Sequence, residues 1–254
     1  MTSPLKVWFE SDGRLLRLRL SRPKANLIDA AMIAALHGAL REHLANGNLG
    51  GVLLDAEGPH FSFGASVEEH LPEQCGAMLK GIHALVMQFV ESPVPVLVAV
   101  RGQCLGGGLE VALSAHMIFV APDSGLGQPE MKLGIFAPAA SCLLPELVGP
   151  TRAIDLLLSG RSITGTDAAA VGMAVLAAEP EAAALSYFTE HLKPKSASSL
   201  RFAVRAARCD YAARVRAKLE RVEGMYLDEL MKSHDAVEGL EAFVGKRAAQ
   251  WQHR

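Results

Sequence analysis

The most constraining feature of the chain is an apolar run, Val94 to Val100, that leads within two residues into Gly102-Gln103-Cys104-Leu105-Gly106-Gly107-Gly108-Leu109-Glu110. The apolar run is typical of a buried strand, and Leu109 to Ala115 has the composition of a helix. Glycines at such a junction let a ligand approach backbone N–H groups at the helix N-terminus, where a developing oxyanion is stabilised. A tight turn or close helix packing would need the same glycines, so both interpretations stay open. The spacing matches neither GxGxxG nor a P-loop.

The first half of the chain alternates short strand patterns with helix patterns. Two strands are expected to form a hairpin around Ser11-Asp12-Gly13, because Asp-Gly supplies left-handed turn geometry, and Asp29 is a suitable helix N-cap. The expected strands cover residues 6–10, 15–20, 51–54, 94–100 and 117–120, and the expected helices cover residues 30–44, 73–90 and 109–115. This alternation predicts an α/β fold with mostly parallel strand pairing.

Beyond about residue 145 the pattern becomes almost wholly helical. Helices are expected at residues 151–158, 167–171, 181–191, 198–230 with breaks, and 236–251, with one short strand within 172–178. The change occurs without a Pro-, Gly- or Ser-rich linker. We therefore expect a core over residues 1–195 and a helical C-terminal region over residues 196–254 that docks on it.

Composition and charge indicate an enzyme-like globule. Half of the 254 residues are apolar and the formal net charge is -2, which gives no reason to expect a nucleic acid or a membrane as the main partner. The first residues lack a signal-peptide pattern, and no apolar run reaches membrane-spanning length. The cysteines form no CxxC or Cys/His cluster, so neither a metal site nor a disulfide scaffold is expected, and a cytoplasmic location is the simplest expectation.

Two glutamates carry the chemical hypothesis. Glu110 lies three residues into the helix that Gly107 opens, among apolar neighbours where an idle carboxylate would be costly. Glu130 follows Gln128-Pro129 in an irregular segment. Two carboxylates beside an oxyanion site can hold water and transfer its protons, which is hydratase chemistry. The structural alternatives are a first-turn acid that complements the helix dipole for Glu110, and a loop acid paired with Lys132 for Glu130.

A second loop of small residues, Phe61 to Val67, follows the strand at Gly51 to Leu54. An ordinary strand-to-helix connection would have the same composition. Two such loops, each leaving a buried strand, could together present two N–H donors to one carbonyl oxygen.

Taken together, these motifs resemble the crotonase, or enoyl-CoA hydratase/isomerase, superfamily over almost the whole chain. The segments that carry the resemblance are Arg22-Pro23-Lys24-Ala25-Asn26, Gly64-Ala65, Gly106-Gly107-Gly108-Leu109-Glu110, Gln128-Pro129-Glu130, Leu158-Ser159-Gly160 and Asp235 to Phe243 with Lys246-Arg247. The resemblance implies an α/β fold with a crotonase-like ββα spiral core and a helical C-terminal trimerisation region. It also implies a homo-oligomer, either a trimer or a dimer of trimers.

The same resemblance assigns roles to individual residues. It implies that the backbone N–H groups of Ala65 and Gly107 form the oxyanion hole for a thioester carbonyl. Glu110 and Glu130 match the two catalytic glutamates of the hydratases, and retention of both favours water addition. Glu130 is the expected donor of a proton to carbon.

A coenzyme A site is implied as well. Its expected residues are Lys24, Ala25, Leu27, Phe63 and Gly64, with Phe243 and Lys246 of the terminal helix covering adenine and meeting phosphate. For Phe243, a role as core anchor of that helix stays open. Coenzyme A is part of the substrate, so no separate cofactor and no metal is expected.

Several segments resemble most closely the superfamily members that hydrate a cyclic dienoyl-CoA in anaerobic benzoyl-CoA degradation. They are Arg22 to Asn26, His60 to Val67, Gly134 to Pro145 and Ser198 to Asp210. This implies addition of water to cyclohexa-1,5-diene-1-carbonyl-CoA to give 6-hydroxycyclohex-1-ene-1-carbonyl-CoA. The alternatives are hydration of linear 2-enoyl-CoA and a non-catalytic scaffold that binds acyl-CoA or RNA.

Basic residues recur at helical spacing near the C-terminus, at Arg201, Arg205, Arg208, Arg214, Arg216 and Lys218. Such a pattern can indicate an RNA-binding surface. Interleaved Glu220 and Glu223 and the negative net charge favour a solvated or subunit-facing helix instead.

Overall fold

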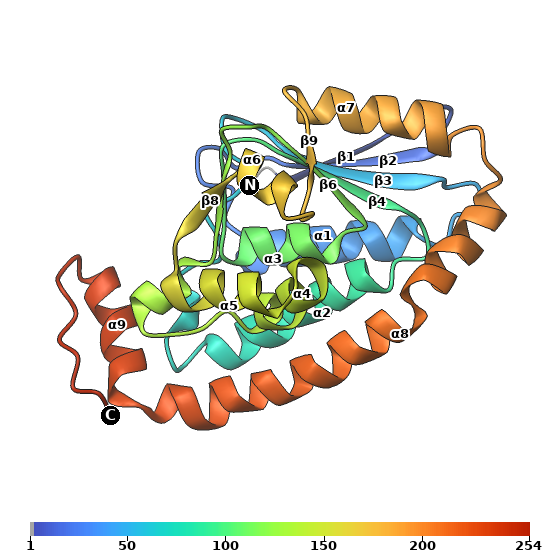
Figure 1. Cartoon of the computed structure of the whole chain (residues 1–254). Helices are drawn as coiled ribbons and strands as arrows, with labels where there is room; N and C mark the ends of the chain where they lie inside the picture. Colours follow the sequence, from blue (N-terminus) through green and yellow to red (C-terminus); the bar gives the residue numbers. More distant parts are fainter. Residues whose placement is uncertain (1–2) are drawn as a thin grey trace.

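The computed structural model describes residues 3–254 and has a mixed α/β architecture (Figure 1). Within these residues, the main sheet has six strands in the spatial order β1 (Leu5–Glu10), β2 (Leu15–Leu20), β3 (Gly51–Ala56), β4 (Val96–Val100), β6 (Met117–Val120) and β9 (Val175–Leu176). β1 and β2 pair antiparallel, and the other neighbouring strands pair parallel. The prediction of an α/β fold with mostly parallel pairing is confirmed.

A second, smaller sheet lies beside the glycine-rich segment and was absent from the sequence-based expectations. Its strands are β5 (Gln103–Leu105), β7 (Gly125–Gly127) and β8 (Ser162–Thr164). Each has three residues, which is too short for a period of two to be detected. β5 ends one residue before Gly106, whose N–H donates to the Gly127 carbonyl at 3.0 Å. This sheet therefore positions the start of the glycine-rich helix.

The local predictions at the N-terminus are confirmed. Ser11, Asp12 and Gly13 have φ angles of 54°, 58° and 79°, which is the left-handed geometry that closes the hairpin between β1 and β2. The Asp29 side chain accepts a hydrogen bond from the Met32 N–H at 2.9 Å and so caps the helix that follows.

The α-helices are α1 (Ala30–His43), α2 (Cys75–Val90), α3 (Gly107–Ser114), α4 (Pro138–Val148), α5 (Pro150–Ser159), α6 (Gly165–Ala170), α7 (Pro180–Tyr187), α8 (Ala197–Gly224) and α9 (His234–Val244). Short 3-10 turns are η1 (Glu68–His70), η2 (Pro129–Leu133) and η5 (Leu230–Lys232), and π-helical turns are η3 (Phe188–Leu192) and η4 (Met225–Glu229). No helix within residues 3–254 is long and apolar enough to cross a membrane.

Two expectations about helices were wrong. α4 was not predicted, because Pro138 begins it and Pro145 lies inside it, and prolines normally interrupt a helix pattern. The terminal helix was predicted to reach residue 251 but ends at Val244. The residues that follow fold back, because Asp235 and Glu238 accept hydrogen bonds from backbone N–H groups of residues 250, 252 and 253.

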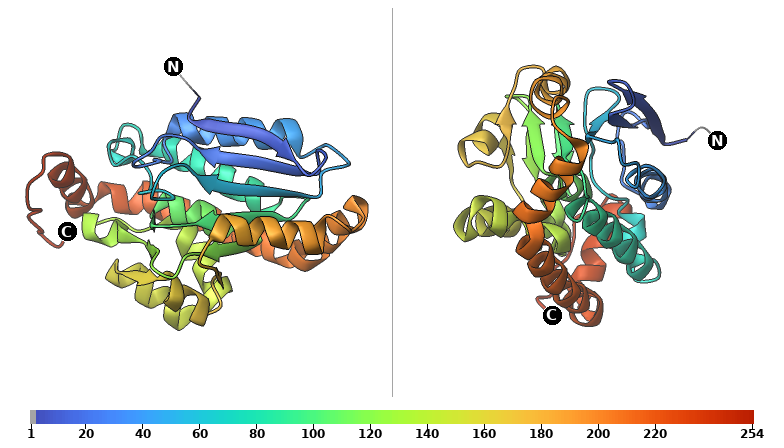
Figure 2. Two further views of the ribbon diagram at one scale, coloured as in Figure 1. Left: turned by 90° about the horizontal axis from the view of Figure 1, so that it is seen from above. Right: turned by 90° about the vertical axis from the view of Figure 1, so that its right-hand side faces the viewer.

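Helices cover both faces of the main sheet. Figure 1 shows α7 on one face and α1, α2 and α3 on the other, and Figure 2 shows these layers from two further directions. Successive residues of a strand point to opposite faces. In β3, Leu53 packs with Phe188 at the end of α7, whereas Val52 and Leu54 belong to the larger core on the opposite face.

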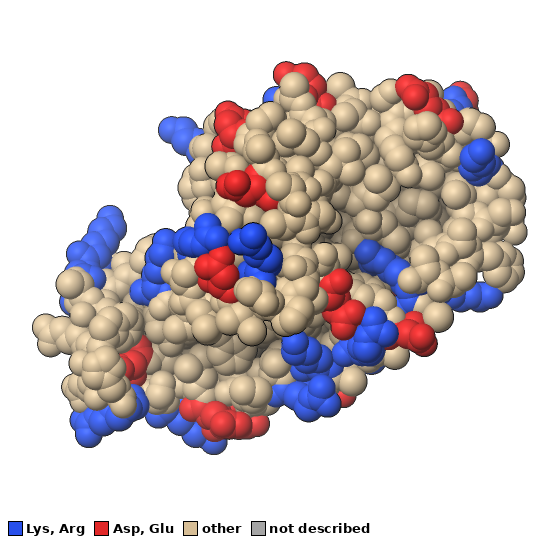
Figure 3. All heavy atoms as spheres, in the orientation of Figure 1, with Lys and Arg blue, Asp and Glu red and all other residues tan. Residues whose placement is uncertain are grey.

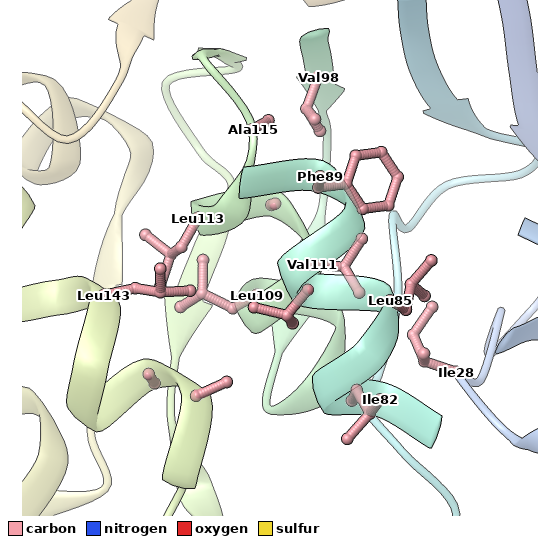
Figure 4. Close-up of a cluster of buried hydrophobic side chains, with 14 of the residues drawn as sticks. Ile28, Ile82, Leu85, Phe89, Val98, Leu109, Val111, Leu113, Ala115 and Leu143 are labelled. Atoms are coloured by element: carbon pink, nitrogen blue, oxygen red, sulfur yellow. The ribbon is translucent and has the colours of Figure 1, made fainter. Parts of the chain in front are cut away.

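The larger core holds α3 in place. Ile82, Leu85 and Phe89 of α2 lie near Leu109 and Val111 of α3, and Leu143 of α4 belongs to the same cluster (Figure 4). Because α3 is packed between α2 and α4, its glycine-rich N-terminus has a defined position.

Helix α8 runs along the outside of the core, with basic and acidic side chains interspersed along it in Figure 3. Two of its arginines turn inward. Arg208 donates to the carbonyls of Val90 at 3.4 Å and Ser114 at 2.9 Å, and to that of Ala115. Arg201 donates to the Leu44 carbonyl at 3.2 Å. Arg208 and Arg201 thus dock α8 on carbonyls at the ends of core helices, a contact that the sequence did not reveal. Arg205, Arg214 and Arg216 are exposed, as expected for a solvated or subunit-facing helix.

Candidate active site

The two small-residue loops predicted from the sequence lie side by side. The Ser62 N–H donates to the Gln103 carbonyl, and the Leu105 N–H donates to the Ser62 carbonyl, both at 3.0 Å. The packing is close, because a β-carbon placed on Gly108 would lie 2.5 Å from the Ser62 Cβ. The loop after β3 and the start of α3 thus form one continuous surface.

Ala65 and Gly107, the two predicted oxyanion-hole residues, meet on this surface. A β-carbon placed on Gly107 would lie 3.2 Å from the Ala65 nitrogen and 3.0 Å from Ile82 Cδ1. Gly64, which precedes Ala65, has φ of 107°, a conformation that a side chain would strain. The missing side chain at Gly107 leaves space beside the Ala65 N–H, at the N-terminus of α3, where an oxygen with developing negative charge is stabilised.

Glu130 approaches the same helix N-terminus from η2. A β-carbon placed on Gly106, which has φ of 50°, would lie 2.7 Å from Glu130 Oε1. Only glycine at position 106 therefore leaves room for this carboxylate. Lys132 lies against Gly160 instead, so the interpretation of Glu130 as a loop acid paired with Lys132 was wrong.

Glu110 is buried on the first turn of α3. Its Oε1 accepts a hydrogen bond from the Ala140 N–H at 2.9 Å. Ala140 lies in the first turn of α4, so the carboxylate is held at the N-terminus of a neighbouring helix. Glu110 therefore does more than complement the dipole of its own helix, because its carboxylate binds the N-terminus of α4.

The two carboxyls influence each other electrostatically. Burial raises the pKa of Glu110 to about 7, although backbone N–H groups of Ala140 and Ala139 act to lower it. Burial and the negative charge of Glu110 raise the pKa of Glu130 to about 8. Near neutral pH the pair therefore retains protons that an exposed carboxyl would have lost, and it can both accept and donate a proton.

Gln128 orients Glu130. The buried Gln128 side chain, in the amide orientation that satisfies its surroundings, donates from its nitrogen to Glu130 Oε2 at 3.1 Å and Oε1 at 3.2 Å. The Gln128-Pro129-Glu130 motif indicated a role for Glu130 but none for Gln128. Its only sequence signal was its place two residues before a candidate catalytic glutamate.

The chain is similar to known proteins over almost its whole length. Residues 10–254 match the family model described as enoyl-CoA hydratase/isomerase. The chain belongs to the enoyl-CoA hydratase/isomerase family. It is 65% identical over 254 residues, covering 100% of this chain and 98% of the relative, to the cyclohexa-1,5-dienecarbonyl-CoA hydratase of Thauera aromatica.

More distant members of the enoyl-CoA hydratase/isomerase family are also similar to this chain. A probable enoyl-CoA hydratase of Bacillus subtilis is 30% identical over 92% of this chain and 94% of the relative. The crystal structure of an enoyl-CoA hydratase/isomerase from Pseudoalteromonas atlantica superposes with a TM-score of 0.83 at 28% identity, covering 98% of this chain and 99% of that one. The predicted crotonase-like α/β fold with C-terminal helices is thereby confirmed.

In this member of the enoyl-CoA hydratase/isomerase family, the two segments expected to bind coenzyme A lie together. The Phe63 N–H donates to the Ala25 carbonyl, and the Ile28 N–H donates to the Gly64 carbonyl, both at 2.9 Å. Lys24 and Phe63 are exposed, and Leu27 is partly buried. These segments therefore form one surface that adjoins Ala65.

Asn26 holds that surface and was missed as a functional residue. It is fully buried, and its amide nitrogen donates to the carbonyls of Glu57 at 2.9 Å and His60 at 3.1 Å. Its Oδ1 accepts from the Arg22 N–H at 2.9 Å. Asn26 thus ties the loop around Lys24 to the strand end that leads to Ala65.

Phe243 and Lys246 lie at the end of α9 and just beyond it. The Phe243 side chain is 55% exposed, so its interpretation as the core anchor of α9 was wrong. Leu240 and Ala242 are the buried anchors instead. α9 packs against η2, which carries Glu130, and against η1. Phe243 and Lys246 therefore belong to an element that borders the candidate site.

Within residues 3–254, the structure brings together no cluster of three or more His, Cys, Asp and Glu side chains suited to a metal ion.

Proposed function

We propose that this protein adds water to cyclohexa-1,5-diene-1-carbonyl-CoA, giving 6-hydroxycyclohex-1-ene-1-carbonyl-CoA. The observation that carries the proposal is the placement of Glu110 and Glu130 around a glycine-rich helix N-terminus that adjoins the Ala65 N–H. The full-length identity of 65% to a cyclohexa-1,5-dienecarbonyl-CoA hydratase supports the cyclic substrate.

The first step is polarisation of the thioester. Its carbonyl oxygen accepts hydrogen bonds from the N–H groups of Ala65 and Gly107, and the N-terminus of α3 adds a partial positive charge. These donors favour electron flow toward the oxygen. The ring carbon β to the carbonyl thereby becomes electrophilic.

The glutamates then position the water. One water molecule donates hydrogen bonds to both carboxyl groups, and the ionised carboxyl accepts a proton as the water oxygen bonds to the β carbon. Gln128 and the Ala140 N–H hold Glu130 and Glu110 during this step. The electron pair of the β carbon's double bond passes through the α carbon to the thioester oxygen.

The ring substrate determines where the proton goes. The intermediate is an enolate extended by the second ring double bond, so protonation at the far end of that double bond restores the thioester carbonyl. One ring double bond remains, conjugated to the carbonyl, and the hydroxyl lies β to it. Glu130 delivers this proton, which balances the one taken from water.

Coenzyme A is held at the edge of the site. The segments around Lys24 to Leu27 and Phe63-Gly64 are joined by backbone hydrogen bonds and carry the exposed residues Lys24 and Phe63. Phe243 and Lys246, on the element that borders η2, cover adenine and meet phosphate. No separate cofactor is required for water addition.

The test is turnover of purified protein with cyclohexa-1,5-diene-1-carbonyl-CoA and with crotonyl-CoA. We expect a preference for the cyclic thioester, and a preference for crotonyl-CoA would overturn the assigned substrate. Glu110→Gln and Glu130→Gln should each lower kcat about 100-fold or more while coenzyme A binding is retained. Glu73→Gln, which alters an exposed glutamate, serves as the control. Full activity in either site variant would refute the catalytic role of the replaced glutamate, whereas absence of turnover of both thioesters by the unaltered protein would favour the non-catalytic alternative.

The chain also has features that support an oligomer, and we propose a trimer or a dimer of trimers. Phe202 on α8 is 61% exposed, beside a cavity of about 540 Å³ whose lining includes Val90, Pro93 and Ala212. Burial of this apolar surface against another copy of the chain would be favourable.

A further inference from the structure

Tyr226 has a buried hydroxyl that the fold does not use. Its side chain is fully buried, and its oxygen has no hydrogen-bond partner among the residues that the structure describes. A buried hydroxyl without a partner costs stability. Tyr226 lies in η4, a π-helical turn directly after α8, and such turns are frequent at functional sites.

The ring of Tyr226 packs on the segment between Glu130 and Ala140, the residue whose N–H binds Glu110. It meets the Phe136 ring edge-on, with centroids 5.3 Å apart and an interplanar angle of 69°. On one side of Phe136, the Ile135 N–H donates to the Glu130 carbonyl at 3.3 Å. On the other side, α4 begins and supplies the Ala140 N–H that binds Glu110. Tyr226 therefore packs on a segment that contacts both glutamates, although it follows Glu130 by nearly a hundred residues.

The charges around the phenol agree with this position. Burial raises the pKa of Tyr226, and negative charge on Cys75, Glu130 and Glu110 acts in the same direction. The hydroxyl consequently stays protonated at any working pH. It remains a hydrogen-bond donor that lies within the electrostatic reach of both catalytic carboxyls.

We propose that the Tyr226 hydroxyl donates a hydrogen bond to the oxygen of the water that adds to the substrate, and to the same oxygen in the product. The water donates its two protons toward Glu110 and Glu130, accepts from Tyr226 with one lone pair, and attacks carbon with the other. Tyr226 is then the third polar group that fixes the direction of attack. This inference rests on the hydratase function proposed above.

The decisive variant is Tyr226→Phe, which removes one oxygen and keeps the ring that packs on Phe136. We expect kcat to fall about tenfold or more and KM to stay within about twofold. The melting temperature should be unchanged or higher, because an unpaired buried hydroxyl is removed. Tyr211→Phe is the matched control, since the Tyr211 hydroxyl on α8 is also buried without a partner but lies near Arg208 and Glu146.

Inhibition constants of two thioesters, with and without the added hydroxyl, distinguish a contact between Tyr226 and that oxygen from a general disturbance of the site. In Tyr226→Phe, inhibition by 6-hydroxycyclohex-1-ene-1-carbonyl-CoA should weaken about fivefold or more. Inhibition by cyclohex-1-ene-1-carbonyl-CoA, which lacks the hydroxyl, should not change. A kcat within about twofold of the unaltered protein, equal weakening for both thioesters, or the same loss of kcat in Tyr211→Phe overturns the proposal.

A failure of the proposed substrate can be distinguished from a failure of this inference. If the unaltered protein hydrates crotonyl-CoA and not the cyclic thioester, the ring assignment fails. The role of Tyr226 is then tested with crotonyl-CoA turnover and with 3-hydroxybutanoyl-CoA and butanoyl-CoA as the paired inhibitors.

Discussion

The adjacent glycines Gly106 and Gly107 shape the candidate site because they have no side chains. At Gly106 a side chain would collide with Glu130 Oε1, and at Gly107 it would crowd the Ala65 nitrogen. The glycine-rich segment first permitted either a tight turn or an oxyanion site. In the structure, the missing side chain at Gly106 leaves space for the Glu130 carboxylate, which we propose to be catalytic, and the missing side chain at Gly107 leaves space beside the Ala65 N–H.

Gly107→Ala tests this use directly. The added methyl group would stand 3.2 Å from the Ala65 nitrogen, where it obstructs the thioester oxygen. We expect kcat to fall about 100-fold, as for loss of an oxyanion donor. The control is Gly76→Ala on α2, where a β-carbon meets nothing within 4 Å. Steady-state kinetics of both variants measure the effect, and near-normal turnover of Gly107→Ala would contradict the assigned position of the oxygen.

The raised pKa values of Glu110, about 7, and Glu130, about 8, predict a pH-dependent stability. Both carboxyls have an ordinary pKa of 4.5 when unfolded, so the folded chain binds protons more tightly. Their contribution to stability is complete below that value and is lost as the pH rises through 7 and 8. Relative to Glu110→Gln/Glu130→Gln, we expect the free energy of unfolding to fall by roughly 6 kcal/mol between about pH 5 and pH 8.

Urea unfolding of the unaltered protein and the double variant at several pH values checks this prediction. Glu73→Gln should follow the unaltered protein, because its carboxyl is exposed. Parallel pH profiles for the unaltered protein and the double variant would show that the site carboxyls have ordinary pKa values.

Among the helices, α8 has arginines on two different surfaces. Arg214 and Arg216 pair with Glu146 and Glu91 and are about half exposed, which agrees with the solvated or subunit-facing helix that was expected in preference to an RNA-binding one. Arg208 turns inward and donates to three carbonyls at the ends of α2 and α3. The helical spacing of the arginines was predicted correctly. The carbonyls that Arg208 binds lie about a hundred residues earlier in the chain, so the local pattern could not reveal them.

Arg208→Met should therefore destabilise the fold. The variant keeps much of the aliphatic stem but leaves buried carbonyls at Ser114 and Ala115 without their charged donor. We expect the free energy of unfolding to fall by about 3 kcal/mol. Arg205→Met, three residues earlier, removes a guanidinium that lies over the Phe202 ring at 4.7 Å, and it should cost about 1 kcal/mol or less. Equal losses in the two variants would argue against a docking role for Arg208.

At the scale of the whole molecule, one buried ion network joins the sheet to its cover. Arg17 and Asp55 have side chains that are 2% and 4% exposed, and Arg17 also pairs with Glu10 and with Glu181 of α7. Along β2, Arg17 and Arg19 alternate with leucines, which is the pattern of a strand with one solvated face. Helix α7 covers this face of the sheet and buries it. The two arginines pair there with the carboxylates of Asp55 and Glu181.

The proposed assembly into a trimer or a dimer of trimers can be measured directly. Light scattering coupled to size exclusion should give three or six chains per particle. Phe202→Glu, on the exposed apolar surface of α8, should shift the particle toward single chains, because a charge there opposes burial. Val7→Glu, at a 40% exposed position of β1, is the control. A monomeric unaltered protein would contradict the proposed oligomer.

The chain by itself determined the α/β class, the hairpin, the Asp29 cap and the pairing of a glycine-rich helix entry with two glutamates. These features depend on local periodicity, turn geometry and short motifs, all of which act within a few residues. The second sheet, α4 and the true end of α9 were not predictable, because three-residue strands, internal prolines and returning backbone contacts carry no local pattern. The donors to the glutamates, the inward arginines and the position of Tyr226 were decided only by tertiary structure. They depend on contacts between segments that are distant in the sequence. Burial in these contacts raises the pKa values of Glu110 and Glu130 and leaves the Tyr226 hydroxyl unpaired among residues 3–254.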